Sequence, residues 1–266
     1  MIVGFYILMF ILGAVLGSFL CCQARRLYLR TTGHKSPGKR SVCLHCKKTL
    51  KWYENIPLIS WLAQKGKCTK CGAKIGWAEF LSELGLGLAF LFFSTSICPF
   101  SATVFEWAIY ISTLVLILTL SFLAIYDGLY GQLPTLCLTF SIICAIITLS
   151  LHLWAFLSVS AFTPEIILKP LGSALILGGL YLLLYLISKG KWVGDGDWLL
   201  GLAIGIALGS PWLALIVLFL SNTLACLVMF PSTKKSKNHK IHFGPFLVIA
   251  FIITVSFSSF LESMIL

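Results

Sequence analysis

The chain contains three aspartates, and each of them stands at the end of a long apolar segment. Asp127 follows the apolar run 107–126, whereas Asp195 and Asp197 belong to a Gly-x-Gly-Asp sequence at 194–197, directly before another apolar run. Ionisable groups beside membrane-length apolar segments cost free energy and are typically functional. If Asp127 and Asp197 meet, their carboxyl groups can share one proton, so that one acts as a general base on water while the other donates to a carbonyl oxygen. This pair predicts aspartyl peptide-bond hydrolysis.

Two other roles for these aspartates stay open at this point. Carboxylates are common N-caps of helices and common residues of solvated loops. In a non-enzymatic membrane transporter or scaffold with a zinc-containing loop, Asp127 and Asp197 would instead bind an ion or relay a proton. The glycines around Asp197 suit hydrolysis, because they let backbone and substrate approach without a Cβ between them.

Four of the ten cysteines form two Cys-x-x-Cys pairs that are 21 residues apart. Each pair can place two thiolates on one side of a tight turn, and two such turns complete the tetrahedral sulfur shell that Zn²⁺ prefers. We therefore expect a structural zinc ion bound by Cys43, Cys46, Cys68 and Cys71. Disulfides, a redox pair or an iron–sulfur centre are the alternatives, and His45 is an alternative ligand. Four protein ligands leave no open position for a catalytic water.

The elements that position these residues are membrane helices. Of the 266 residues, 59% are hydrophobic and 11% are charged, and the mean hydropathy is +0.97, whereas an average soluble domain is roughly 25% charged. This composition excludes a water-soluble globular domain and predicts an all-α polytopic membrane protein, because about 20 apolar helical residues cross a bilayer. Eight spans are expected, at 1–22, 80–98, 107–126, 135–154, 171–188, 197–209, 212–230 and 245–262.

The net charge of +11 is concentrated in one loop. Residues 23–78 hold 13 of the 20 Lys and Arg residues and one acid, Glu54, which gives this loop a charge of +12 and the rest of the chain a charge of −1. A charge confined in this way does not indicate a nucleic-acid partner; we expect it to lie against anionic lipid headgroups of the bilayer. By the positive-inside rule the loop is cytoplasmic and the N-terminus lies outside.

Threading eight spans from this start places the connections 127–134, 189–196 and 231–244 on the cytoplasmic side, together with Asp127 and Asp197. The charges agree with this topology. The lysines expected inside are Lys189, Lys191, Lys234, Lys235, Lys237 and Lys240. The glutamates expected outside are Glu106, Glu165 and Glu262, and Lys169 is the single basic exception.

We divide the chain into a first transmembrane helix at 1–22, a cytoplasmic zinc-binding loop domain at 23–78 and a transmembrane core at 79–266. The first segment is expected to be retained, because a cleaved signal peptide carries its positive charge before the apolar run rather than after it. The loop has 56 residues. A domain of that size usually needs a metal or disulfide staple.

Six short motifs follow one another in order along the chain. They are Gly17-Ser18-Phe19-Leu20, Ser41-Val42-Cys43, the stretch Trp52 to Trp61, Asp127 with Pro134 seven positions on, the box Gly194 to Asp197, and Phe243-Gly244-Pro245-Phe246. Together they resemble the type IV prepilin peptidase family, also called leader peptidase/N-methyltransferase, across nearly the whole chain. Each motif alone would be a weak signal, but the ordered set is specific.

The resemblance implies an inner-membrane aspartyl protease of the GxGD type that removes the leaders of type IV prepilins and pseudopilins after a glycine, at the cytoplasmic face. It implies Asp127 and Asp197 as the catalytic pair. Members with the cysteine loop commonly also methylate the new N-terminus from S-adenosyl-L-methionine, and they serve type IV pili or type II secretion. A GxGD protease of the presenilin or preflagellin kind is a second enzymatic alternative, and the cysteine loop favours the prepilin interpretation.

The sequence does not locate a methyl-donor site. No Gly-x-Gly-x-x-Gly follows a strand, so such a site must be built from loop and membrane residues. Glu79 could contact a cofactor or a substrate amine, but we expect it to pair with a loop lysine. The aromatic residues Trp52, Tyr53 and Trp61 are expected to pack the small domain or to lie at the membrane interface, rather than to stack on an adenine.

Overall fold

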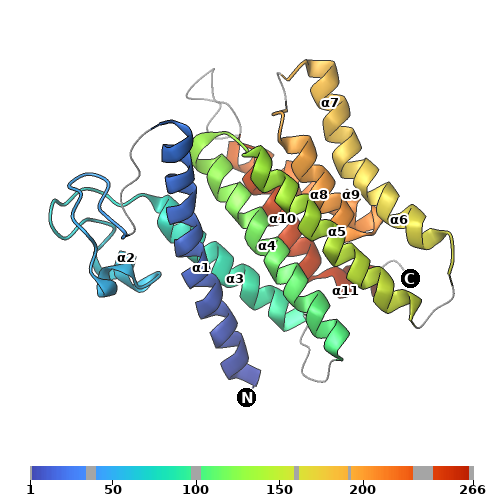
Figure 1. Cartoon of the computed structure of the whole chain (residues 1–266), viewed down its shortest axis with the longest axis horizontal. Helices are drawn as coiled ribbons and strands as arrows, with labels where there is room; N and C mark the ends of the chain where they lie inside the picture. The colour runs from blue at the N-terminus through green and yellow to red at the C-terminus, as the bar shows by residue number, and fades with distance from the viewer. Residues whose placement is uncertain are drawn as a thin grey trace. The chain divides into compact units, whose positions relative to one another are not determined.

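All regular secondary structure is helical, apart from two isolated β-bridges, in the residues that the structure describes: 2–33, 40–96, 103–158, 162–190, 193–229 and 242–263. The computed structural model divides the chain into two compact units, Met1–Ser94 and Thr95–Leu266 (Figure 1). The all-helical fold class with a four-cysteine cluster in the loop is confirmed. The three-part division at residues 22 and 78 stays a prediction.

The first unit consists of two long helices and the loop between them. These are α1 (Ile2–Thr31) and α3 (Trp77–Ser96), and the loop holds η1 (Trp52–Asn55) and α2 (Ile59–Ala63). The second unit contains the remaining helices. They are α4 (Val104–Tyr130), α5 (Thr135–Leu157), α6 (Glu165–Ala174), η2 (Leu175–Gly179), α7 (Leu180–Ser188), α8 (Asp197–Leu208), α9 (Pro211–Met229), α10 (Gly244–Ser256) and α11 (Ser258–Ser263).

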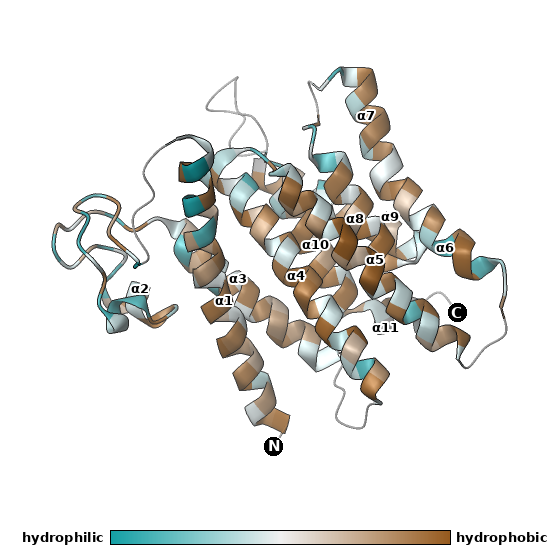
Figure 2. Ribbon diagram, in the orientation of Figure 1, coloured by the Kyte–Doolittle hydropathy of each residue, from teal (hydrophilic) through white to brown (hydrophobic). Residues whose placement is uncertain are grey.

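Six helical segments of the described chain are long and apolar enough to cross a membrane (Figure 2). They are Ile2–Thr31, Trp77–Ser96, Val104–Tyr130, Thr135–Leu157, Glu165–Ser188 and Pro211–Val228. The other two expected spans, 197–209 and 245–262, contain the shorter apolar helices α8 and α10. Each of the eight expected spans therefore contains an apolar helix, and two of these helices are short.

Helices α1 and α3 approach each other through two glycines that lie four residues apart on α1. A Cβ on Gly13 would collide with the backbone of Leu86, and a Cβ on Gly17 would collide with the backbone of Ser82. Small residues at this spacing let membrane helices pack backbone to backbone, where lipid leaves little hydrophobic driving force for association. Helix α1 also continues beyond the apolar run that ends at residue 22, so its last turns carry Arg25 across to the start of α3.

The second unit is built around α8, which packs against α5, α6 and η2. Two glycines make this contact close: a Cβ on Gly205 would lie 2.8 Å from the Cα of Ala174, and one on Gly201 would lie 3.0 Å from the carbonyl oxygen of Leu177. Helix α10 in turn packs against α4, α8 and α9. These contacts bring the C-terminal end of α4 and the N-terminal ends of α8 and α10 together in one unit.

A tight turn joins α8 and α9 in the second unit. Gly209 ends α8 with a φ of +61°, and α9 begins two residues later at Pro211. Lys169, the basic exception to the expected topology, forms a 2.8 Å ion pair with Glu165 one turn earlier on the exposed surface. Cys98, Lys191, the four lysines of 231–241 and the side chain of Glu262 lie outside the described residues.

Candidate active site and candidate metal centre

Asp127 lies in the last turn of α4, and only 6% of its surface is exposed. Its Oδ2 accepts a 3.0 Å hydrogen bond from the backbone N–H of Gly244, the first residue of α10. A carboxylate is disfavoured near the carbonyl end of its own helix, whereas the N-terminus of another helix stabilises it. The N-terminus of α10 therefore supplies partial positive charge to the Asp127 carboxylate, which the C-terminal end of α4 cannot supply. Asp127 is not an N-cap.

Asp197 is the first residue of α8 and is 8% exposed. Its Oδ2 accepts a 2.9 Å hydrogen bond from the backbone N–H of Gly194. This bond joins the first and last residues of the Gly-x-Gly-Asp sequence. The N-cap position belongs to Gly196, which means that Asp197 is not an N-cap either. Asp195 is exposed.

The two buried carboxylates lie close enough for their charges to repel each other. A close contact between Gly196 and the side chain of Leu133 brings their segments together. A Cβ on Gly196 would lie 2.6 Å from the Cβ of Leu133, in the connection between α4 and α5. The structure thus brings together the two aspartates that the sequence singled out, although they are 70 positions apart in the chain. Two buried carboxyl groups whose charges repel each other do not both ionise readily.

His242 is a residue of this site that the sequence analysis missed. Its Nδ1 lies 3.9 Å from Oδ1 of Asp127, and its ring packs against Gly131, the left-handed residue that ends α4. A Cβ on Gly131 would lie 2.6 Å from the ring, so a glycine is required there. The available signal was the position of His242 directly before the Phe-Gly-Pro-Phe motif.

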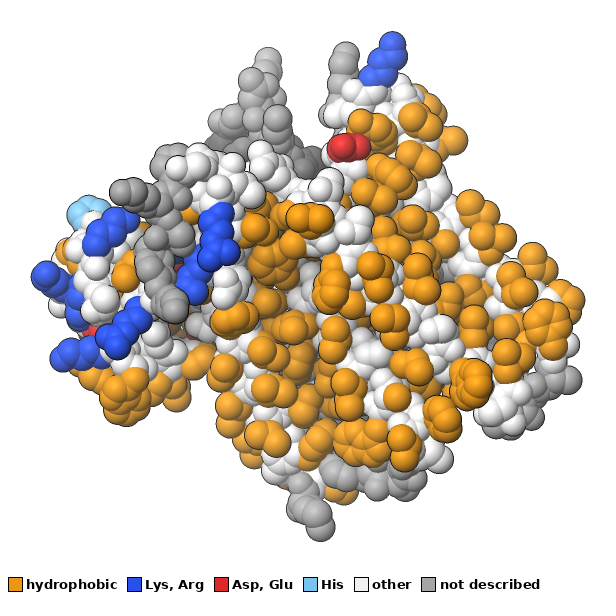
Figure 3. Space-filling model, in the orientation of Figure 1, with side chains coloured by type: hydrophobic (Ala, Val, Ile, Leu, Met, Phe, Trp, Pro, Cys, Tyr) orange, Lys and Arg blue, Asp and Glu red, His pale blue; other side chains and the backbone are white. Residues whose placement is uncertain are grey.

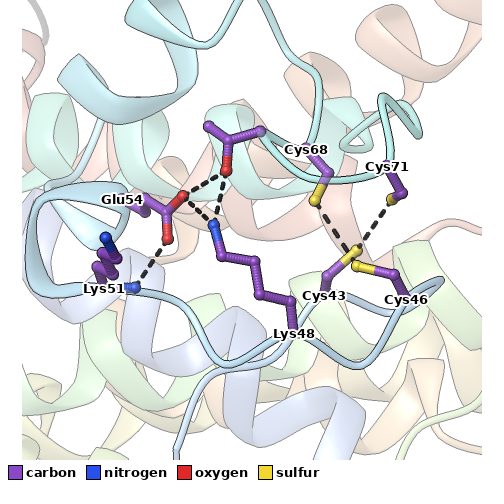
Figure 4. A network of polar contacts seen from close by, with 8 residues as sticks. Cys43, Cys46, Lys48, Lys51, Glu54, Cys68 and Cys71 are labelled. Carbon is purple, nitrogen blue, oxygen red and sulfur yellow. Dashed lines mark hydrogen bonds and ion pairs between the residues drawn. The ribbon is translucent and has the colours of Figure 1, made fainter.

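The four loop cysteines converge in space. Cys43 Sγ lies 3.9 Å from Cys71 Sγ, Cys46 Sγ lies 4.0 Å from Cys68 Sγ, and all four sulfur atoms lie within 4.8 Å of one another (Figure 4). A tetrahedron with Zn–S distances of about 2.3 Å has sulfur atoms about 3.8 Å apart. The cluster could therefore hold a metal ion, and its donor set of four thiols is the one that zinc prefers. His45 does not belong to this group of donor atoms.

The two cysteine turns repeat the same backbone pattern. The N–H of Cys43 donates to the carbonyl of Lys48, and the N–H of Lys47 donates back to Cys43. In the second turn Cys68 donates to Ala73, and Gly72 donates back to Cys68. Lys47 and Gly72, one in each turn, have φ values of +56° and +68°. The short Cys-x-x-Cys spacing therefore produces two equivalent turns, each presenting a pair of sulfur atoms.

Backbone dipoles favour thiolate formation at the first cysteine of each turn. The backbone N–H of Cys71 lowers the pKa of Cys68 to about 6, and the backbone N–H of Cys46 lowers the pKa of Cys43. A backbone hydrogen bond from Ala73 lowers the pKa of Cys71, but burial and the neighbouring sulfur atoms outweigh it and raise this pKa to about 11. The thiols therefore do not all ionise by themselves, whereas a bound divalent cation would stabilise four thiolates.

Glu54, the lone acid of the loop, links the two cysteine turns. Its carboxylate accepts hydrogen bonds from Lys48 Nζ at 2.7 Å, from the backbone N–H of Lys51 at 2.8 Å, and from the hydroxyl of Thr69 beside Cys68 (Figure 4). Hydrogen bonds from Lys48, Lys51 and Thr69 lower the pKa of Glu54 to about 2. A buried carboxylate with three donors thus acts as a brace between two segments that the sequence separates.

The loop also contacts the start of α3. Leu58 has φ +61° and ψ −52°, a γ-turn conformation that is strained for a residue with a side chain. Its backbone N–H donates to Glu83 Oε2 at 2.7 Å, and Glu83 is buried. The ring of Trp61 packs at 4.8 Å from both Trp77 and Phe80. Trp61 therefore packs the loop against α3.

Glu79 has a different partner from the one expected. Its Oε1 pairs with Arg25 of α1 at 2.5 Å, rather than with a lysine of the loop. The expectation was wrong because α1 extends beyond residue 22 and carries Arg25 to the first turn of α3.

Comparison with known proteins identifies the family of this chain. Residues 11–97 match the family model described as the Bacterial Peptidase A24 N-terminal domain. The prepilin leader peptidase/N-methyltransferase of Stutzerimonas stutzeri is 31% identical over 214 residues, which cover 79% of this chain and 69% of the relative. The chain belongs to the prepilin leader peptidase/N-methyltransferase family. The family includes enzymes of the same name from Aeromonas hydrophila, 31% identical over 79% of this chain and 69% of the relative, and from Myxococcus xanthus, 42% identical over 32% of this chain and 25% of the relative.

Membership of the peptidase A24 prepilin leader peptidase/N-methyltransferase family makes this chain a multi-pass membrane enzyme. The cysteine cluster lies inside the stretch that matches the N-terminal domain model, and Asp127 and Asp197 lie beyond it. No solved structure matches the chain.

Proposed function

We propose that this protein is an aspartyl endopeptidase that removes the leader peptides of type IV prepilins or pseudopilins by cutting after a glycine at the cytoplasmic membrane face, with Asp127 and Asp197 as its catalytic residues. The observation that carries the proposal is the pair of buried carboxylates at the ends of α4 and α8, held within one unit of a chain of this family. The names of the relatives support prepilins as substrates.

Each carboxylate has one oxygen held by a backbone N–H and one that can serve the reaction. Gly244 holds Oδ2 of Asp127, and Gly194 holds Oδ2 of Asp197. With one proton shared, the ionised carboxylate takes a proton from water while the protonated one donates to the carbonyl oxygen of the scissile bond. Water attacks the carbonyl carbon to give a gem-diol. The aspartate that took a proton from water then gives it to the leaving amine, and a hydroxyl of the gem-diol returns its proton to the other aspartate as the carbonyl re-forms. The surrounding glycines leave room for an extended substrate backbone.

The cysteine cluster is proposed to hold a structural Zn²⁺ ion through Cys43, Cys46, Cys68 and Cys71. The 3.9 and 4.0 Å sulfur distances and the four-thiol donor set support zinc. The ion would fix two turns that a segment of this size cannot hold with a hydrophobic core alone. With four protein ligands it takes no part in bond cleavage.

The second half of the family's name supports a second activity, methylation of the amino terminus that cleavage exposes. S-adenosyl-L-methionine would supply the methyl group, which passes to the amine nitrogen as the sulfonium becomes a thioether. The positive-inside rule predicts that the loop and both aspartates face the cytoplasm, where the methyl donor is available. It also predicts that the N-terminus lies outside.

Mass spectrometry of a prepilin after incubation with the detergent-purified protein and S-adenosyl-L-methionine tests the proposal. We expect a product shortened at a glycine that also carries the mass of one added CH₂ group. A shortened, unmethylated product would confine the enzyme to proteolysis. No cleavage of several prepilins by zinc-loaded, folded protein would remove the peptidase assignment.

A further inference from the structure

A pocket of about 150 Å³ lies within the first unit, among the last turns of α1, the cysteine loop and the start of α3. Its charged lining residues are Arg25, Arg26, Arg40 and Glu79, which together carry a net charge of +2. The only acid among them is already paired with Arg25. The pocket therefore presents a positive wall that suits an anion.

The chemistry of this wall favours a phosphate group. Guanidinium groups present planar sets of N–H donors that match phosphate oxygens, and they do so better than ammonium groups. Arg26 comes from α1 and Arg40 from the loop, so an anion in the pocket would be approached from two segments. In the space-filling view Lys and Arg side chains gather over this part of the chain (Figure 3).

The side of α1 that lines the pocket carries exposed apolar residues nearer the N-terminus. Ser18 and Cys22 line the pocket. Leu8, Ile11 and Val15 are exposed and continue the same three- and four-residue spacing toward the N-terminus, so all five residues share one side of the helix. From Ser18 to Leu8 the helix rises about 15 Å. This is half of a hydrocarbon core of about 30 Å, the thickness of one leaflet.

We infer that the pocket binds the phosphate of an anionic phospholipid such as phosphatidylglycerol, with one acyl chain along Leu8, Ile11 and Val15. The headgroup sits where the apolar run of α1 gives way to arginines, which is the depth of lipid phosphates. A zwitterionic lipid is bound less well, because its ammonium group would face the same positive wall. The bound lipid would hold the end of α1 and the cysteine loop at a fixed depth in the bilayer.

The net charge also distinguishes the lipid from the methyl donor. S-adenosyl-L-methionine carries a sulfonium, an ammonium and a carboxylate, so it is a net cation and suits this wall poorly. The lipid site does not depend on the proposed peptidase activity, because it uses no residue of the aspartate pair.

The test uses the full-length protein in nanodiscs of phosphatidylcholine with a minor fraction of phosphatidylglycerol. After transfer to detergent and washing, the lipids that stay bound are counted by mass spectrometry. We expect selective retention of phosphatidylglycerol, and we expect R40Q and R26Q each to reduce this retention about tenfold.

The matched control is R30Q, because Arg30 is an exposed arginine in the last turn of the same helix and does not line the pocket. It should retain phosphatidylglycerol as the unmodified protein does. Zinc content reports folding of the loop in each variant, and R40Q carries the test if R26Q does not fold.

Each of the following results would overturn the inference. They are equal retention of both lipids, an equal loss in R30Q and R40Q, and release of the retained lipid by added S-adenosyl-L-methionine. The last result would identify the pocket as the donor site. Release by inorganic phosphate alone would show that the pocket selects a free anion rather than a lipid.

Discussion

The cysteine loop and the aspartate site differ in the range of the contacts that build them. In the loop, each turn is closed by hydrogen bonds between residues four or five positions apart, and the turns are then braced by the Glu54 carboxylate. In the aspartate site the decisive contact joins Asp127 to Gly244, 117 positions away. Local turns can present ligands before the rest of the chain is folded, whereas the carboxylate pair exists only once three helix ends have met.

The largest effect is expected from the aspartate pair. D127N or D197N should reduce prepilin cleavage about a thousandfold or more, because each removes a proton-transfer group from the pair. D195N is the matched control, since Asp195 is exposed two positions from Asp197, and it should cleave within a few-fold of the unmodified protein. Product formation followed by mass spectrometry gives the rates. Cleavage retained in both D127N and D197N would contradict the catalytic assignment.

The next effect concerns the metal and leaves the membrane helices in place. C43S or C68S should lower zinc content from about one ion per chain to nearly none and make the loop sensitive to protease, because structural zinc contributes roughly 10 kcal/mol or more to folding. C226S, at an exposed cysteine of α9, should keep its zinc. Elemental analysis measures the zinc content, and limited proteolysis measures the protease sensitivity of the loop. Full zinc content in both loop variants would refute the four-cysteine shell.

A smaller effect on cleavage is expected at Gly244, where α10 contacts the Asp127 carboxylate. In G244A the new Cβ would lie 2.8 Å from Oδ2 of Asp127, so the carboxylate must move. Overpacking of this kind costs about 1–3 kcal/mol, and we expect cleavage to fall about tenfold or more. In G128A the nearest atom would be Pro245 Cγ at 3.6 Å, an ordinary contact, and cleavage should change little. Equal rates for the two variants would show that Asp127 is not held by close packing at α10.

The smallest effect concerns the brace between the cysteine turns. E54Q should make the loop several-fold more sensitive to protease at neutral pH, whereas E165Q, at an exposed acid of the other unit, should not. Because the pKa of Glu54 is lowered to about 2, its stabilising contribution is fully present above its ordinary pKa of 4.5 and is lost as the pH falls through about 2. The difference in thermal unfolding between E54Q and the unmodified protein should therefore persist from pH 7 to about 4.5. A difference that vanishes near pH 6 would argue against this brace.

The features that could be predicted from the sequence are those with local signals. Long apolar runs indicate helices without any knowledge of their neighbours, so all eight segments were found. The two Cys-x-x-Cys pairs indicate their own turns, so the cluster of Cys43, Cys46, Cys68 and Cys71 was found as well. Asp127 and Asp197 were singled out because charge is rare beside apolar runs.

The features that escaped prediction depend on how segments pack. Glu79 was expected to pair with a lysine, but the extension of α1 places Arg25 there first. The position of His242 before the Phe-Gly-Pro-Phe motif did not reveal its proximity to Asp127, because only the left-handed turn at Gly131 makes room for its ring. The role of Glu54 could not be predicted, because the sequence does not show that Lys48 and Thr69 are neighbours in space.

The shortness of α8 and α10 has a consequence for the supply of water. With 12 and 13 residues, these helices rise only about 18–20 Å, whereas the hydrocarbon core is about 30 Å thick. A hydrophobic segment that falls short of the core thins the surrounding bilayer. Because α8 begins at Asp197 and α10 begins beside Asp127, bilayer thinning at these helix ends would adjoin the carboxylate pair. The proposed hydrolysis consumes a water molecule, and thinning at these helix ends would bring the aqueous boundary closer to Asp127 and Asp197.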